Sequence, residues 1–460
     1  MNCVYMTGYK VKGIKTLDQL VELSFYKKTL TNPIETQEYN IKGIYGKNGT
    51  GKSGIITSAD ILRKLLTSVD YLNNPIVQRS LSELINKKVN ELFIEIDYLL
   101  DLQNRPVLFR YEVTLGRGIN GKYSIIAEEL YSKSATSRKE EFDRIIEVKY
   151  GELIFIRKNK NDNLPGILVA KTTNLLGTAS IASLFFEKIL INSDYKESTS
   201  DLFISLFGLV LLGNRISVSM EISDDHSSYS IINILHNLQN QENNGLDAET
   251  IIKKLRQNLN EVDRSRINVF SIDGNIVPHD LFEEYTREVR RLQDFLRIFK
   301  TDLVKIDIDK KERGTTSFCK LIMVYDSYSI DVEFESTGVK KLIKLFLYFE
   351  EMVEGGIVFI DELDSNLHDV YLCALLEYLM KYGEGQLCFT THNVGPMDVL
   401  KKQKKSIDFL SEDHKVYPWK TNGNYSPSKL YRSGMIEGSP FNVDATDFIG
   451  ILDSLGEDSE

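Results

Sequence analysis

The chain has 460 residues, of which 42% are hydrophobic and 27% are charged, a balance typical of a globular protein with a sizeable core and more than one structural unit. Its net charge of −10 disfavours a protein that binds nucleic acid non-specifically over its whole surface. Four scattered cysteines form no CxxC pair, which argues against a disulfide framework and a zinc site: Cys3, Cys319, Cys373 and Cys388.

Neither the N-terminus nor the most apolar run of the chain predicts a membrane segment. The first ten residues, MNCVYMTGYK, contain no apolar stretch of the kind found in secretory signals. Residues 202–212 are the most apolar run, but they are well short of the ~20 residues that cross a bilayer. We therefore expect a cytoplasmic protein in which this run forms a buried helix or strand.

In chain order, the N-terminal part of the sequence predicts strands that precede and follow a glycine loop. Residues 1–30 alternate short apolar runs and turns, and residues 41–45 read as a buried strand that enters the loop. A helix is expected over 53–67. Further strands are expected over 92–98, 107–115 and 123–127. This pattern predicts a β-rich portion within an α/β chain.

The middle of the chain predicts helices, and its end returns to strands. Apolar stripes at helical spacing cover 251–262 and 285–299, and they fit either a short antiparallel arm or two ordinary helices on a core. Strands are expected over 328–334, 356–360 and 385–391. We expect an α/β fold with a split head: residues 1–130, a mostly helical insert over 131–310, and residues 311–460.

One segment matches the phosphate-loop pattern G-x-x-x-x-G-K-[ST] in full. It consists of Gly46, Lys47, Asn48, Gly49, Thr50, Gly51, Lys52 and Ser53. The glycines allow backbone amides to approach phosphate oxygens, and the following helix begins with free N–H groups. Lys52 is expected to reach the β- and γ-phosphates, and the Ser53 hydroxyl to bind Mg²⁺.

A second segment supplies carboxylates at the end of a buried strand. Residues 356–360 are an apolar run, and Asp361 and Glu362 follow it directly. The carboxyl ends of such strands are where α/β sheets bind ligands. With the phosphate loop upstream, Asp361 is expected to share the Mg²⁺ ion with Ser53. Glu362 is expected to act as general base for the attacking water.

Three more motifs follow in a characteristic order. Phe334-Glu335-Ser336-Thr337-Gly338 precedes an amphipathic helix that Ser336 can cap. Asp364 follows the acidic pair, and His392 follows the strand at 386–389. The order resembles that of ABC-type ATPase heads: phosphate loop, signature, acidic strand, D-loop and switch histidine. The resemblance implies that Ser336, Thr337 and Gly338 bind the γ-phosphate of ATP held by another copy.

The same resemblance assigns the remaining roles and marks two departures. Asp364 takes the D-loop position, and His392 is expected to contact the γ-phosphate or the catalytic water, with Glu362 as the base. The signature lacks the glutamine of the transporter form LSGGQ, and the family's Q-loop glutamine has no clear counterpart; Gln103 lies in an apparent hairpin turn. ATP rather than GTP is implied by the family alone.

Within the ABC type, the motifs Glu335-Ser336-Thr337-Gly338, Asp361-Glu362-Leu363-Asp364 and Thr391-His392-Asn393 resemble the OLD-like (AAA15) ATPases, relatives of SMC and RecF heads. Residues 430–438 resemble the tail of that group. No further carboxylate arrangement of a TOPRIM nuclease follows His392. The resemblance implies an ATPase subunit of a bacterial anti-phage system, such as PARIS or Septu. It would form at least a dimer and control a separate effector, such as a TOPRIM or HNH nuclease, in response to a phage protein or nucleic acid.

The sequence is also consistent with other functions. A DNA repair or maintenance ATPase of the RecF or SMC kind is the main alternative, and a scaffold that binds but does not hydrolyse nucleotide is another. A transporter ATPase is less consistent with the signature. Two basic runs, 157–160 and 401–405, fit either solvated surface or a nucleic-acid contact.

Overall fold

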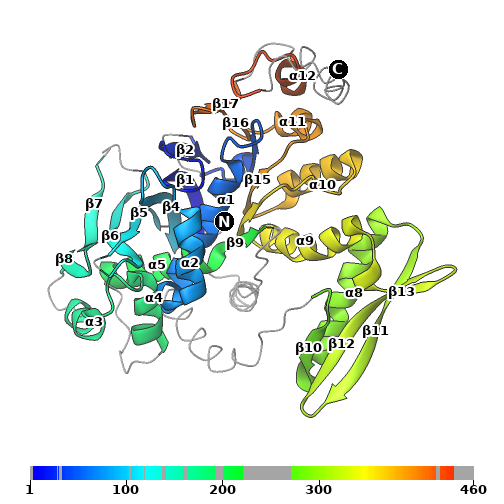
Figure 1. Ribbon diagram of the computed structural model, residues 1–460, viewed down its shortest axis with the longest axis horizontal. Helices are drawn as coiled ribbons and strands as arrows, with labels where there is room; N and C mark the ends of the chain where they lie inside the picture. Colours follow the sequence, from blue (N-terminus) through cyan, green and yellow to red (C-terminus); the bar gives the residue numbers. More distant parts are fainter. Residues whose placement is uncertain are drawn as a thin grey trace, which may run out of the picture.

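The computed structural model describes residues 4–27, 30, 34–102, 105–118, 120–136, 141–158, 163–191, 200–220, 271–420 and 425–439. Within these ranges the chain builds three sheets, which Figure 1 shows with their helices. Two of the sheets lie in adjacent layers, and the third forms a lobe beside them.

The first sheet is antiparallel and has seven strands in the order β2-β1-β4-β5-β6-β7-β8. Its strands are β1 (Val4–Lys12), β2 (Val21–Ser24), β4 (Leu92–Leu102), β5 (Arg105–Arg117), β6 (Tyr123–Ser134), β7 (Asp143–Lys149) and β8 (Glu152–Ile156). The strands predicted over 92–98, 107–115 and 123–127 are confirmed, and all three are longer than expected.

The second sheet holds the motifs. Its order is β17-β16-β3-β15-β14-β9. The strands are β3 (Ile41–Tyr45), β9 (Ile216–Ser219), β14 (Ile357–Ile360), β15 (Gln386–Thr390), β16 (Ile407–Leu410) and β17 (Val416–Pro418). The five from β16 to β9 are parallel, and β17 pairs antiparallel at the edge. Every residue of those five strands is buried, as expected for a parallel sheet covered on both faces.

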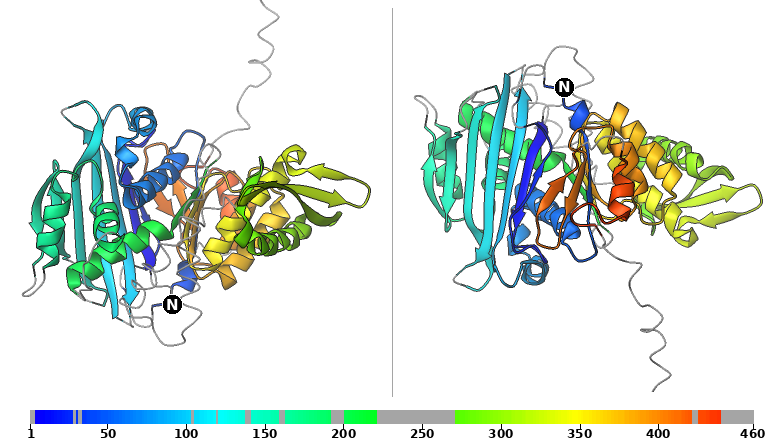
Figure 2. Two further views of the ribbon diagram at one scale, coloured as in Figure 1. Left: turned by 90° about the horizontal axis from the view of Figure 1, so that it is seen from below. Right: turned by 90° about the horizontal axis from the view of Figure 1, so that it is seen from above.

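Helices cover both faces of this parallel sheet (Figure 2). Three lie between it and the antiparallel sheet: α1 (Lys52–Thr67), α4 (Ile181–Phe185) and α5 (Asp201–Arg215). Side chains of both sheets share one apolar core there, including Val11, Ile44 and Phe359. On the opposite face lie α9 (Thr337–Val353), α10 (Asp369–Tyr382) and α11 (Gly395–Leu400), which pack on a second core.

The third sheet forms the separate lobe at the lower right of Figure 1. It contains β10 (Asn275–Pro278), β11 (Leu303–Arg313), β12 (Thr316–Tyr325) and β13 (Ser329–Asp331). Helix α8 (Phe282–Phe299) covers it with the apolar stripe that the sequence showed, including Tyr285, Val289, Leu292 and Leu296. The stripe therefore packs on a sheet and on α9, as an ordinary amphipathic helix does.

Shorter elements complete the described chain. They are η1 (Gln37–Tyr39), η2 (Tyr71–Asn73), α2 (Pro75–Leu84), α3 (Leu164–Thr172), the π-helix η3 (Phe186–Ile191), η4 (His279–Leu281), η5 (Val332–Phe334) and α12 (Pro427–Arg432). The apolar run at 202–212 lies in the buried helix α5. No helix of the described part combines the length and the apolar character needed to span a bilayer.

Two expected boundaries need correction. The limit at 130/131 falls inside β6, and β7 and β8 continue the same antiparallel sheet, so the strands do not end where the helical insert was expected to begin. The limit at 310/311 falls inside β11. Both limits fall where charged residues interrupt the apolar pattern of a strand, as Glu128 and Glu129 do in β6 and residues 310–313 do in β11. The predicted helix over 251–262 lies outside the described residues.

Candidate functional site

The phosphate loop connects β3 to α1. The strand predicted over 41–45 is confirmed, and α1 begins at Lys52. Gly51 caps the helix with φ of 100°, a left-handed conformation that glycine adopts without strain. A Cβ atom on Gly51 would lie 2.3 Å from Leu17 Cδ2, so the loop after β1 also requires a glycine here. The segment therefore has the local geometry of an anion-binding turn at a helix N-terminus.

Lys52 lies folded over this loop. Its ammonium donates to the carbonyl oxygens of Gly46 at 2.8 Å and Lys47 at 2.9 Å, and Thr50 Oγ1 donates to the same Lys47 oxygen at 3.0 Å. Burial lowers the Lys52 pKa, while the nearby carboxylates of Asp361, Glu362 and Asp364 oppose that shift. A buried cation thus lies among three acids that come from a segment 300 residues away.

The outer part of the loop is more open. Asn48 and Gly49 are exposed, and the half-buried Lys47 pairs with Glu412 at 3.1 Å. At the start of the loop, a Cβ on Gly46 would lie 2.4 Å from the Leu410 carbonyl oxygen. The end of β16 therefore packs tightly on the loop and holds its first residue in place.

The acids follow β14, and a threonine at the end of β15 holds them. Thr390 Oγ1 donates to Asp361 Oδ1 at 2.6 Å and accepts from the Glu362 N–H at 2.8 Å. Because β14 and β15 are parallel neighbours, their carboxyl ends meet at one edge of the sheet. We refer to Lys52, Asp361, Glu362 and Thr390 as the strand-end cluster.

Glu362 has an unusual backbone. Its φ is 49°, in the left-handed region that costs a residue with a Cβ roughly 1–3 kcal/mol and that occurs often at functional sites. Three hydrogen bonds hold it there: one from its N–H to Thr390, and two to its carbonyl oxygen, from Lys341 Nζ at 2.6 Å and from the Ser365 N–H at 3.1 Å. The conformation places the Glu362 carboxylate near Lys52.

The predicted signature lies at the start of α9. Ser336 is the N-cap of the helix, and its hydroxyl accepts from the Val339 N–H at 3.4 Å. Ser336 and Thr337 are exposed. Glu335 accepts from Tyr325 Oη at 2.5 Å and from the Ser336 N–H at 2.9 Å. The segment is thus fixed by its own chain while the two hydroxyl-bearing residues remain exposed.

Asp364 and His392 lie at the same edge of the parallel sheet but differ in environment. Asp364 is half-buried near Lys52, and its Oδ1 atom is buried without a hydrogen-bond partner. His392 is exposed two residues beyond the end of β15. Among the described residues no hydrogen bond or ion pair fixes its imidazole. The geometry brings Asp364 to the phosphate loop, and the switch role of His392 stays a prediction.

Sequence reasoning missed three residues at this site. Thr390 bridges the two acids, and Lys341 binds the Glu362 carbonyl. Lys15, in the loop after β1, lies near Asp361, whose charge opposes the lowering of the Lys15 pKa by burial. The position of Thr390 at a strand end was a usable signal. Lys15 and Lys341 carry no motif, because their roles follow from how distant elements pack.

The residues present fit a magnesium ion. Mg²⁺ prefers oxygen ligands and usually takes one or two from the protein, with the rest from phosphate and water. Ser53, in the first turn of α1, has a hydroxyl, and Asp361 has a carboxylate that Thr390 already orients. This donor set suits the ion, which would neutralise charge on a bound triphosphate.

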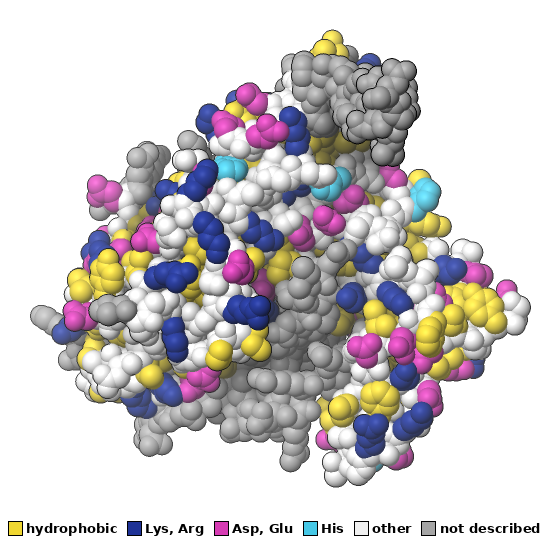
Figure 3. Space-filling view, in the orientation of Figure 1, with side chains coloured by type: hydrophobic (Ala, Val, Ile, Leu, Met, Phe, Trp, Pro, Cys, Tyr) yellow, Lys and Arg dark blue, Asp and Glu magenta, His cyan; other side chains and the backbone are white. Residues whose placement is uncertain are grey.

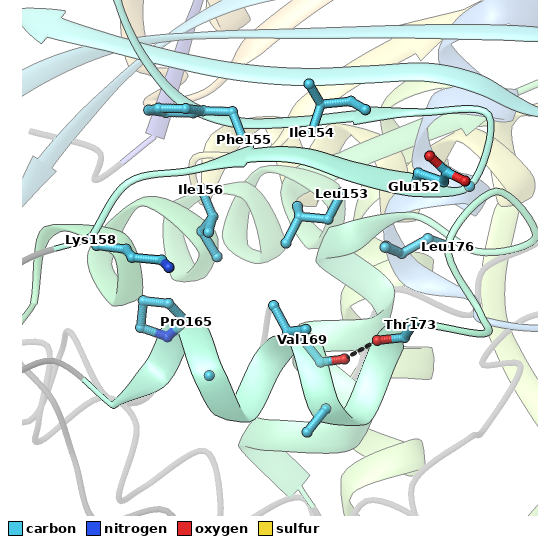
Figure 4. A pocket seen from close by; sticks show the side chains of 13 residues that line it. Glu152, Leu153, Ile154, Phe155, Ile156, Lys158, Pro165, Val169, Thr173 and Leu176 are labelled. Carbon is cyan, nitrogen blue, oxygen red and sulfur yellow. Dashed lines mark hydrogen bonds between the residues drawn. The ribbon is translucent and has the colours of Figure 1, made fainter.

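A separate groove of about 960 Å³ lies between β8 and α3 (Figure 4). Leu153 and Ile156 of β8 face Val169 and Pro165 of α3 across it, with Lys158 near one end. Its lining is mainly apolar and contains a single cation, Lys158, so it offers little to a triphosphate. The phosphate loop does not contribute to it.

No family model matches the sequence, and a search of curated proteins finds no match. Among solved structures, the chain resembles RecF–ATPrS of the RecFOR pathway with 14% identity and a TM-score of 0.36, over 91% of this chain and 99% of that one. It also resembles the Smc head domain with a coiled coil and joint from Pyrococcus yayanosii, with 13% identity and a TM-score of 0.39, over 91% and 97%. Overlaps this low do not establish a shared fold, so the function is inferred from the site itself.

Proposed function

We propose that this protein is an ABC-type ATPase that binds MgATP at the phosphate loop and hydrolyses it when a second copy closes over the nucleotide. One observation carries the proposal: the buried Lys52 of a complete phosphate loop lies beside Asp361 and Glu362, which follow the next strand but one in a parallel sheet. This arrangement supplies a phosphate-binding turn, a metal ligand and a base together.

Each residue has a defined task in this mechanism. The amides of the loop and Lys52 bind the phosphates, and Ser53 with Asp361 holds the ion that neutralises their charge. Glu362 orients the attacking water and accepts its proton. The exposed Ser336 and Thr337 would bind the γ-phosphate held by the neighbouring copy, so hydrolysis would require at least a dimer.

The motif order supports a regulatory role. Its resemblance to nuclease-free OLD-like ATPases supports a switch in anti-phage defence that controls a separately encoded effector, such as a TOPRIM or HNH nuclease. In this role a phage protein or nucleic acid would act as the trigger. The ATP-dependent change between open and closed copies would hold or release the effector.

The surface disfavours the alternative role in DNA maintenance. Three lysines of the basic run at 401–405 pair with acids: Lys401 with Asp398, Lys402 with Glu377 and Lys404 with Glu38. Over α8 and the third sheet, basic and acidic side chains are interspersed on the face shown in Figure 3. Phosphate backbones are bound by surfaces of one sign, and these two regions do not provide one.

Replacement of the base tests the proposal. Wild-type protein should release phosphate from MgATP, and Glu362→Gln should lower kcat by about 100- to 10,000-fold, the usual contribution of a general base. Because ATP then persists, Glu362→Gln should also form a larger species with ATP on size-exclusion chromatography with light scattering. Glu377→Gln, on the outer side of α10, is the matched control and should behave as wild type. Wild-type protein without ATPase activity, or equal rates for wild type and Glu362→Gln, would contradict the proposal.

A further inference from the structure

The first two turns of α9 are fastened to the loop that follows β14. A Cβ atom on Gly338 would lie 2.8 Å from the Asn366 carbonyl oxygen, so the helix and the loop are in direct backbone contact. Thr337 Oγ1 donates to Asn366 Oδ1 at 3.5 Å. Lys341 donates to the Glu362 carbonyl oxygen at 2.6 Å and to Ser365 Oγ. The exposed signature and the proposed base therefore belong to one packed unit.

Lys341 contacts this unit at Glu362, whose backbone is constrained. The Glu362 backbone has a left-handed φ of 49°, which a residue with a Cβ keeps only when its surroundings enforce it. Thr390 satisfies the Glu362 N–H from the β15 side, while the Glu362 carbonyl accepts from Lys341 on the α9 side and from the Ser365 N–H at 3.1 Å. Lys341 also donates to Ser365 Oγ, so loss of its ammonium would remove both of its contacts with this turn and loosen the backbone that aims the Glu362 carboxylate.

We propose that Lys341 is a positioning residue that couples the signature of each copy to Glu362 of the same copy. The inference rests on the function proposed above. When Ser336 and Thr337 bind the γ-phosphate of the neighbouring copy's ATP, they fix the start of α9. Lys341, little more than one turn further along, transmits that position to the Glu362 carbonyl of its own chain. Occupancy of one nucleotide site thereby sets the geometry of the other.

Three variants test this role. Lys341→Met keeps the apolar stem and removes the ammonium; kcat should fall about 10- to 100-fold, the effect of displacing a reacting group by about 1 Å, with KM for ATP within about twofold. Lys341→Arg restores a cation at the same place and should recover part of kcat. Lys340→Met makes the same chemical change at the adjacent position, whose side chain makes no hydrogen bond or ion pair among the described contacts, and should match wild type.

Equal kcat for Lys341→Met and Lys340→Met would overturn the inference, as would a rise in KM that accounts for the whole effect.

Mixed oligomers determine which copy Lys341 serves. Glu362→Gln is combined with Lys341→Met because it stops hydrolysis while ATP and both signatures stay in place. Both changes in one subunit, mixed with wild type, should leave one working site, because the wild-type subunit keeps its own Glu362 and Lys341. The two changes in different subunits should impair both sites. The opposite pattern would show that Lys341 acts on the neighbour's site and would overturn the inference. If wild-type protein itself hydrolyses no ATP, the proposed function fails first, and the inference falls with it.

Discussion

The strand-end cluster and the start of α9 differ in how much of their chemistry one chain supplies. Lys52, Asp361 and Thr390 are largely enclosed, and each already has partners within its own chain. Ser336 and Thr337 are exposed at a helix N-terminus, and within the described residues their hydroxyls have only weak contacts of 3.4 and 3.5 Å. The cluster is therefore organised before ligand arrives, whereas the start of α9, in the proposed function, is completed by a ligand that another copy brings.

This difference separates binding from hydrolysis. A preorganised, partly buried set of charges can bind a phosphate without rearrangement, which favours affinity. An exposed helix N-terminus offers N–H groups and hydroxyls that are hydrated in the free protein. They contribute binding free energy only when a phosphate displaces that water. Changes in the cluster should alter both binding and hydrolysis, while changes at the start of α9 should alter hydrolysis alone.

The largest expected effect on ATP binding comes from Lys52→Ala. Removing the cation leaves the charges of Asp361, Glu362 and Asp364 without their buried partner and removes the main contact to phosphate. ATP affinity measured by isothermal titration should fall by about 100-fold or more, since charge-assisted hydrogen bonds contribute roughly 1.5–3 kcal/mol each. Lys47→Ala, on the open part of the loop, should weaken binding far less. Equal ATP affinities for the two variants would show that Lys52 is not the main contact to the phosphates.

The central strands and the loop were predictable because their signal is local. The burial of β14 on both faces requires a continuous apolar run, and the phosphate loop requires glycines where other residues would clash. The cap at Ser336 was also visible, since a serine before an amphipathic stretch marks a helix start. These features depend on neighbours in the sequence, so a single sequence reveals them.

The remaining features depend on packing between distant elements. Lys341 is one of three lysines in α9, and nothing in the sequence distinguishes it from Lys340. Lys15 reaches the acids only because the antiparallel sheet stacks over the phosphate loop. The long strand β11 was missed because its mostly exposed, highly charged pattern resembles a solvated surface. Sequence reasoning thus located the motifs but not the side chains that join them.

A smaller effect, on hydrolysis alone, should follow from Ser336→Asp. Aspartate caps a helix as well as serine does, so α9 should keep its N-terminus. Its carboxylate would repel the γ-phosphate of the neighbouring copy. Phosphate release should fall about 100-fold, a typical cost of losing a donor to developing charge, while the ATP dissociation constant stays within about twofold. Ser433→Arg, on the surface just after α12, controls for a charged replacement of an exposed serine. A matching loss of affinity in Ser336→Asp would place this serine at its own chain's nucleotide and erase the distinction between the two regions.

The smallest effect should come from Thr390→Val, which tests whether the cluster is organised by its own hydrogen bonds. Valine keeps the shape and burial of the side chain but can neither donate to Asp361 nor accept from the Glu362 N–H. Because Lys52 and the loop remain intact, ATP affinity should be unchanged. The value of kcat should fall about 10-fold, and half-maximal activity should require more Mg²⁺, since Asp361 loses the group that orients it.

Thr391→Val is the matched control. The Thr391 hydroxyl accepts from the Asn393 N–H at 2.9 Å and makes no hydrogen bond to either acid. If both variants lose the same activity and the same thermal stability, the threonine acts only in packing. A loss confined to Thr390→Val, with a shifted Mg²⁺ requirement and an unchanged Tm, would show that one hydroxyl at a strand end positions both the metal ligand and the base by hydrogen bonds.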